Sequence, residues 1–240
     1  MKKRLLSLLL CFSICACFFP TMQTQAATKK ADYQMFKESV NYEDGDKIRG
    51  IVSFEYPLLK GDSNAINSIN AQLQKAAEDF FTSDSAKNLK DYTMTSIKEN
   101  RFYDDSEQYY YETYCTVSYN KNNILSLCMS YRWYAGGVQN QGDYGYTFDL
   151  NTGKQLAITD VVKGTPKQVK NKILTAAKKY FQGEEGSSFA SWEEVSPVIK
   201  KIPLKNFKFY VSPKKVNLCF ESYELGTNFW TSFTINGIYK

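Results

Sequence analysis

The chain has 240 residues, with 30 basic and 25 acidic side chains and no histidine, so its formal net charge is +5. Three basic residues and no acidic residue lie in positions 1–27, which leaves 27 − 25 = +2 for the remainder. This near-neutral remainder argues against binding to nucleic acid or electrostatic binding to a membrane. Without histidine, Ser-His-Asp and Cys-His catalytic systems and His-containing zinc sites are excluded, and we expect no metal and no cofactor.

The N-terminus has the layout of a bacterial secretory signal peptide. Residues 2–4 are basic, residues 5–20 are almost wholly apolar, and a polar stretch ends at Ala27. The apolar run is shorter than the roughly 20 residues that span a membrane. We therefore predict a cleaved leader over 1–27 and a secreted or cell-surface bacterial protein. An uncleaved anchor is one alternative, and lipidation at Cys17 is another, which would tether the protein to a membrane.

Alternation of apolar residues predicts strands, and apolar residues three or four apart predict helices. Ser63 or Asp62 begins a helix that ends near Thr82, and residues 83–107 look polar, irregular and partly strand-like. This order predicts an α+β fold of mainly antiparallel sheets with two or three helices, in halves 33–134 and 135–240. The predicted strands are 33–42, 47–57, 109–119, 124–134, 142–150, 207–211, 215–221 and 229–235, and the later helices are one from Pro166 to about Tyr180 and one over 189–201.

Three cysteines remain after the leader, and two of them lie on one predicted hairpin. A turn centred on residues 120–123 pairs positions whose numbers sum to 243, which places Cys115 directly opposite Cys128, about 5 Å away. An exported protein permits disulfides, so we predict a Cys115–Cys128 bridge. The alternative is two reduced, packed thiols, because such a bridge strains a regular sheet. Cys219 lies in a predicted strand and is expected to be buried.

The same hairpin is rich in aromatic residues. Residues 109–111 are three consecutive tyrosines, and the partner strand carries Tyr131, Trp133 and Tyr134. Successive strand residues point to opposite faces, so at least one of the three tyrosines must face away from the core. Surface aromatics suit recognition of a protein or a sugar. The alternative is that they cover a second core layer.

Several sequence motifs occur together in the chain. They are a Tyr-x-Tyr-x-Gly-Gly-like segment at 131–137, a Phe-Asp-Leu-x-Thr-Gly-Lys-like segment at 146–156 followed by 159–162, and a Tyr-Glu-Ile-like ending at 209–211, 219–220 and 223–225. These motifs resemble a bacterial extracytoplasmic domain of unknown function, and residues 56–70 look like its companion N-terminal domain. The pair occurs in the ectodomain of the RsiV anti-sigma factor and in front of the catalytic domain of PdaC-type peptidoglycan deacetylases.

This resemblance implies an RsiV-ectodomain-like fold and a sensing or binding module without the deacetylase domain or a cytoplasmic part. The family continues Gly-Gly with Ala-His-Gly, whereas Val138-Gln139-Asn140 follows here, so no histidine acts at that point. We place Tyr134, Gly136, Gly137, Tyr223 and Glu224 near the functional surface. The two glycines would permit a backbone turn that other residues disfavour.

We therefore expect an exported, non-catalytic module that recognises a protein, lysozyme being one specific candidate, or a cell-wall glycan. The alternative is a carboxylate-dependent hydrolase of cell-wall polymers that uses Asp149, Asp160, Glu221 or Glu224. A third interpretation is a structural envelope protein whose aromatic residues all lie in the core.

Overall fold

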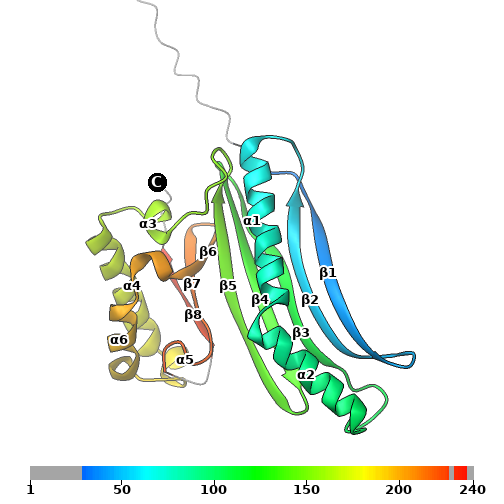
Figure 1. Cartoon of the computed structure of the whole chain (residues 1–240). Coiled ribbons are helices and arrows are strands. Elements are labelled where there is room, and N and C mark those ends of the chain that lie inside the picture. Colours follow the sequence, from blue (N-terminus) through cyan, green and yellow to red (C-terminus); the bar gives the residue numbers. More distant parts are fainter. Residues whose placement is uncertain (1–28, 227–229, 237–240) are drawn as a thin grey trace, which may run out of the picture.

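The computed structural model describes residues 29–226 and 230–236, so the predicted leader and Cys17 lie outside the described residues. The fold is α+β, as predicted, with a five-stranded sheet of order β1-β2-β3-β4-β5 and a three-stranded sheet of order β6-β7-β8 (Figure 1). The elements are β1 (Tyr33–Asp44), β2 (Lys47–Leu59), α1 (Asn64–Phe81), α2 (Asp84–Lys98), β3 (Tyr109–Lys121), β4 (Ile124–Ala135), β5 (Val138–Asp149), α3 (Ile158–Val161), α4 (Pro166–Phe181), α5 (Glu184–Ser187), α6 (Trp192–Lys201), η1 (Leu204–Asn206), β6 (Lys208–Ser212), β7 (Lys215–Phe220) and β8 (Thr231–Asn236).

All strand pairs are antiparallel except β2 with β3, which are parallel and joined by the two helices. Helices α1 and α2 cover one face of the large sheet, as Figure 1 shows. Ile69 and Leu73 of α1 are fully buried in the same cluster as Phe54 of β2, and Phe54 packs on Phe80 with ring centroids 5.1 Å apart. The helix begins where predicted, because the side chain of Ser63 accepts a hydrogen bond from Ile66 N.

Helix α2 was not predicted, and the expectation of irregular or strand-like structure at 83–107 is wrong for its first part. Ser83 caps the helix by accepting a hydrogen bond from Ala86 N. Its buried positions are Ala86, Leu89, Thr93 and Ser96, so only one of the four is a large apolar residue. Such a thin apolar stripe gives little periodic signal, although it suffices when β2, β3 and β4 lie against it.

At the cysteines, the register of the β3–β4 hairpin differs from the prediction by one residue. The turn consists of Asn122 and Asn123, both with positive φ, so the numbers of paired residues sum to 245 beside the turn. A bulge between Val117 and Tyr119 changes this sum to 244 for the pairs farther from the turn. Cys115 therefore lies opposite Met129, and Cys128 lies opposite Thr116. Neighbouring strand residues face opposite sides, so the two thiols lie on opposite faces of the sheet. The predicted Cys115–Cys128 disulfide is wrong, and both are free thiols, as is Cys219.

The C-terminal part is built on the small sheet. Helices α4 and α6 cover one face of it, where Val169, Ile173 and Ile199 pack in one core with Val216 and Leu218. The small sheet also contacts the large sheet, because β6 packs against β5. None of the helices within residues 29–226 is long and apolar enough to cross a membrane.

The predicted division at residues 134 and 135 falls at the end of β4, directly before the turn that leads into β5. β5 pairs with β4 along its whole length, from Val138 opposite Ala135 to Asp149 opposite Ile124. Residues 138–149 thus form the edge of the large sheet, and β5 is the strand that lies beside the C-terminal part in Figure 1. The junction between the two parts therefore runs along this strand.

Candidate ligand-binding cleft

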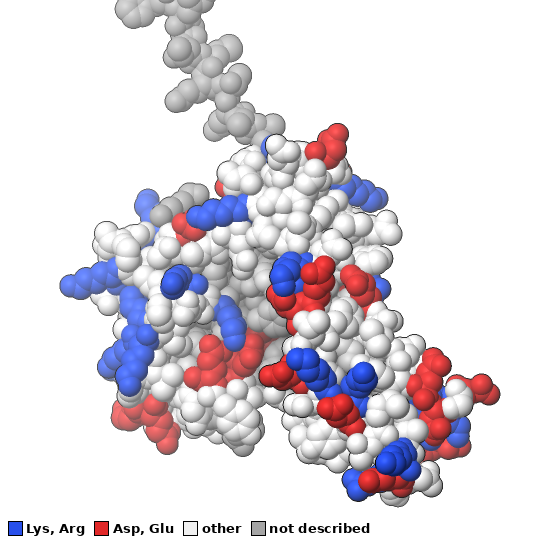
Figure 2. Space-filling view, viewed as in Figure 1, with Lys and Arg blue, Asp and Glu red and all other residues white. Residues whose placement is uncertain are grey.

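A cleft of about 790 Å³ lies along this junction. Figure 2 shows a hollow between α1 and the C-terminal part, with uncharged side chains inside it and both basic and acidic side chains at its rim. The ends of α1 and α2, the edge strand β5 and the segments beside β6 and after β7 form its walls. The residues on these walls include Phe80, Ser85, Tyr111, Tyr131, Trp133, Asn140, Tyr144, Tyr146, Gln155, Lys205, Lys208, Glu221, Ser222 and Tyr223.

Four tyrosines form a row across three strands in this cleft. The ring centroids of Tyr111 and Tyr131 are 6.4 Å apart, those of Tyr131 and Tyr144 are 6.3 Å apart, and those of Tyr144 and Tyr146 are 5.8 Å apart. Strand geometry places them together, because Tyr144 and Tyr146 are two residues apart on β5 and share a face. Phe80 of α1 stacks on Tyr111 at 4.0 Å and fixes that end of the row. We call these four residues the tyrosine row.

The hydroxyl groups of the tyrosine row remain protonated at neutral pH. Burial raises the pKa of Tyr146 to about 12. Burial also raises the pKa of Tyr111, Tyr131 and Tyr144 above the ordinary value for a phenol. Each ring therefore offers an uncharged apolar face together with a hydroxyl group that can donate or accept a hydrogen bond.

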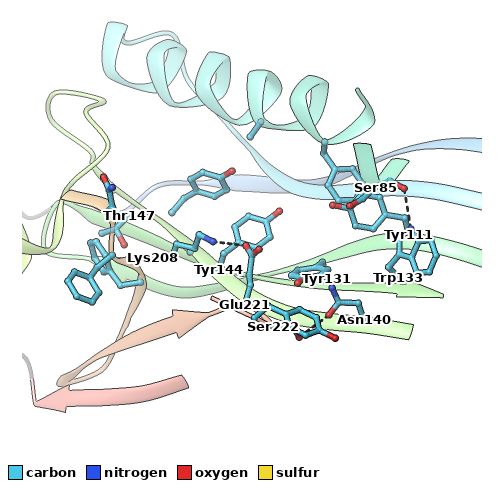
Figure 3. A pocket seen from close by; sticks show the side chains of 18 of the residues that line it. Ser85, Tyr111, Tyr131, Trp133, Asn140, Tyr144, Thr147, Lys208, Glu221 and Ser222 are labelled. Carbon is cyan, nitrogen blue, oxygen red and sulfur yellow. Dashed lines mark hydrogen bonds and ion pairs between the residues drawn. The ribbon is translucent and has the colours of Figure 1, made fainter. Parts of the chain in front are cut away.

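A charged pair stands on the opposite wall. Nζ of Lys208 lies 2.8 Å from Oε1 of Glu221 and 3.4 Å from Oε2 of Glu224. Glu224 also accepts a hydrogen bond of 3.0 Å from the backbone N–H of Glu221, which holds the turn after β7 in place. Burial alone would lower the pKa of Lys208, but the hydrogen bond and charge of Glu221 outweigh it and raise the pKa. Figure 3 shows Lys208 and Glu221 beside Tyr144.

The far end of the cleft carries uncharged polar groups. Trp133 donates a hydrogen bond from Nε1 to the carbonyl oxygen of Ser85, at 3.1 Å. The hydroxyl of Ser222 donates to Oδ1 of Asn140, at 3.0 Å, and thereby connects the C-terminal part to β5. These residues lie together at the right of Figure 3. Tyr223 beside them is 73% exposed.

Two of the five predicted binding residues lie at this cleft. Tyr223 lines it, and Glu224, which is not a lining residue, pairs with the lining residue Lys208. Tyr134 instead pairs with Tyr110, on the opposite face of the sheet from Tyr131, because the two positions on β4 differ by an odd number.

Gly136 and Gly137 form the β4–β5 turn, with φ of 57° and 91°, and neither lines the cleft. The turn has the predicted backbone conformation, but it lies beyond the end of the tyrosine row. The residues that the prediction omitted are Tyr144, Tyr146 and Lys208. The alternation of Tyr144, Tyr146 and Phe148 is visible in the sequence and was the available signal for the first two.

The four carboxylates considered for a hydrolase do not gather in one place. Asp149 accepts hydrogen bonds from the backbone N–H groups of Asn151 and Thr152, and so holds a turn. Asp160 caps α3 by accepting from Ala157 N, at 3.0 Å. Only Glu221 of the four lines the cleft, and Glu224 accepts a hydrogen bond from its backbone N–H. Within the described ranges, no three His, Cys, Asp or Glu side chains are grouped so that they could hold a metal ion.

Comparison with known proteins supports the resemblance seen in the sequence. Residues 43–140 match the family described as Deacetylase PdaC, a match that runs from β1 into β5. Two crystal structures of proteins of the DUF3298 family resemble most of the chain. The chain shares the fold of these two proteins.

The first DUF3298 protein is from Bacteroides fragilis, with a TM-score of 0.55 and 15% identity over 88% of this chain and 92% of that one. The second is from Pseudomonas aeruginosa, with a TM-score of 0.51 and 12% identity over 86% and 89% of the two chains. At these identities the DUF3298 similarity concerns the fold. No curated protein sequence matches the chain.

Proposed function

We propose that this protein is a non-catalytic binding module of the bacterial cell envelope, and that its cleft binds a cell-wall glycan. The tyrosine row carries the proposal. Sugar rings present C–H faces that pack on aromatic rings and hydroxyl groups that bond to phenols, amides and ion pairs, and the cleft offers all of these. Its volume of about 790 Å³ lies within the ~300–1,000 Å³ typical of ligand pockets.

The balance of charge also supports an uncharged sugar. Lys208 is already paired with Glu221 and Glu224, so the pair offers hydrogen bonds without a large net charge. A cell-wall polymer is the favoured glycan because the chain resembles modules that precede peptidoglycan deacetylases, and because its N-terminus resembles a signal peptide.

Binding of soluble peptidoglycan fragments, followed by calorimetry and by tryptophan fluorescence, tests this proposal, because Trp133 lines the cleft. We expect saturable binding that Tyr144→Ala weakens by about tenfold or more. Tyr103→Ala is the matched control, since Tyr103 is 92% exposed and does not line the cleft, and it should bind as the wild type does. Failure of every fragment to bind would overturn the proposal.

The same fragments test whether the module is non-catalytic. We expect no new products after prolonged incubation with the protein. If products appear, and if Glu221→Gln abolishes them while the variant still binds, then the cleft belongs to a carboxylate-dependent hydrolase instead.

A protein ligand is the second candidate, because a different surface favours it. On the sheet face opposite the helices, the guanidinium carbon of Arg132 lies 4.7 Å from the ring centroid of Tyr110 and 5.0 Å from that of Tyr114. Arginine and tyrosine are enriched among residues that dominate protein interfaces. Lysozyme is the specific partner to test. Binding that Tyr114→Ala abolishes and Tyr144→Ala leaves unchanged would support this second function.

A further inference from the structure

A second hollow continues the cleft along α1. Its volume is about 540 Å³, and α1 forms one wall with Ser68, Ala71, Gln72, Lys75 and Asp79. The two hollows share Ala76, Tyr146 and Gln155, so the second begins where the first ends. Tyr146, the last ring of the tyrosine row, stands at the junction.

The two hollows together are long. Asn140 and Tyr146 are six residues apart on β5, which corresponds to about 20 Å at the rise of an extended strand. On the facing wall, Ser68 and Phe80 are twelve residues apart on α1, or about 18 Å at the rise of a helix. Figure 3 shows the same direction, from Trp133 and Asn140 at one end, past Tyr144, to Thr147 at the other. A single sugar ring would occupy only a fraction of this length.

The polar groups of the second hollow suit a neutral polymer. The amide nitrogen of Gln72 donates to the carbonyl oxygen of Gly153, at 2.8 Å, which holds the loop after β5 against α1. Lys75 and Asp79 form an exposed ion pair one helical turn apart. Both charged groups are exposed, so they can form hydrogen bonds with the hydroxyl groups of a ligand.

We propose that the cleft and the second hollow form one trough that binds a linear oligosaccharide, with successive sugar rings along the tyrosine row and beyond Tyr146. This inference rests on the proposed glycan binding of the cleft. It adds that several successive rings of the polymer are bound at once, so that affinity increases with the length of the chain.

The test compares oligosaccharides of β-1,4-linked N-acetylglucosamine with two, four and six rings, together with peptidoglycan fragments of matched length, by calorimetry. We expect the affinity to rise by about tenfold or more between two and six rings, because the longer chain reaches the second hollow. Equal affinities for short and long chains would overturn this inference and leave the proposed function intact. Binding of none of them would overturn the proposed function itself.

A blocking variant locates the second hollow. Ala71 is exposed on α1 and lines it, so Ala71→Trp places a large ring there without disturbing the core. We expect this variant to bind the six-ring oligosaccharide only as tightly as the two-ring one. Its affinity for the two-ring oligosaccharide should equal that of the wild type. Gln74→Trp is the matched control, because Gln74 is exposed on the same helix and lines neither hollow. Equal affinities of the six-ring oligosaccharide for Ala71→Trp and for the control would contradict the inference.

Discussion

Lys208 at the start of β6 and Glu221 directly after β7 form an ion pair of 2.8 Å that closes one wall of the cleft. Both side chains are more than a third exposed, at 37% and 39%, so water screens the pair considerably. The pair therefore contributes more to the shape of the cleft than to the free energy of unfolding.

The stability of Lys208→Ala tests whether the ion pair contributes little to the free energy of unfolding. We expect the free energy of unfolding to fall by about 1 kcal/mol, the upper part of the range for exposed ion pairs, because two carboxylates lose their partner. Urea denaturation measures the change. Lys167→Ala, at an exposed position of α4 away from the cleft, should change it by less than about 0.5 kcal/mol. A loss of several kcal/mol in Lys208→Ala would show that the pair is a core element instead.

Glu112 makes stability depend on pH. Burial alone would raise the pKa of this carboxyl group, but hydrogen bonds from Arg132 and Tyr114 and the charge of Lys37 outweigh burial and lower it. A lowered pKa means that the native state binds the proton less readily than the unfolded state does. The stabilisation is thus fully present above the unfolded value of about 4.3, and it is lost as the pH falls through the lower native value.

Glu112→Gln should therefore cost about 1.5–3 kcal/mol at pH 7, the range for hydrogen bonds to charged groups. The difference from the wild type should shrink as the pH falls below about 4, because the native carboxyl group is then becoming neutral as well. Denaturation curves over a pH series measure both effects. A difference that stays constant down to pH 2 would contradict the role of the charge.

Gly145 sets the distance between the two sheets. A Cβ atom at this position would overlap the carbonyl oxygen of Phe209 on β6. We expect Gly145→Ala to lower the free energy of unfolding by about 2–3 kcal/mol, as overpacking commonly does. In the control Gly137→Ala, the new Cβ meets no atom within 4 Å, and only the positive φ of 91° is unfavourable, at about 1 kcal/mol. Equal losses in the two variants would mean that the sheets are not in close contact.

The thiols should be unreactive in the native protein. Burial raises the pKa of Cys115 to about 12 and that of Cys128 to about 11, so the reactive thiolate is scarce at neutral pH. We expect slow alkylation of both under native conditions and rapid alkylation in denaturant without a reductant. Peptide mapping by mass spectrometry follows each residue. A peptide in which Cys115 is joined to Cys128 would contradict the register of the β3–β4 hairpin.

Glycan binding should depend little on pH between about 6 and 9, because the chain has no histidine and the phenols of the tyrosine row ionise above that range. Calorimetry with one oligosaccharide across this pH range measures the affinity at each pH. A change in affinity of about tenfold with a midpoint near pH 7 would require a group other than the tyrosine row at the site.

Local patterns were sufficient to predict most elements. The apolar side of a strand follows from the alternation of residues, as in 47–57 and 142–150. The apolar side of a helix follows from the spacing of residues such as Ile69 and Leu73. Capping residues such as Ser63 mark where a helix begins, because their side chains bond to the next turn. Helix α2 has a capping residue of the same kind, Ser83, but its thin apolar stripe gives little periodic signal. The bulge after Val117 depends on the pairing with β4, which the local sequence does not reveal.

The sequence by itself determined the α+β order, the shared face of Tyr144 and Tyr146, and the absence of histidine chemistry, because these follow from composition and from the geometry of a single element. Only the tertiary structure decided that the tyrosine row faces Lys208 and Glu221, that Cys115 and Cys128 lie on opposite faces, and that Tyr134 points away from the cleft. The physical reason is that a strand alternates its side chains regardless of context, whereas packing between distant segments decides what covers each face.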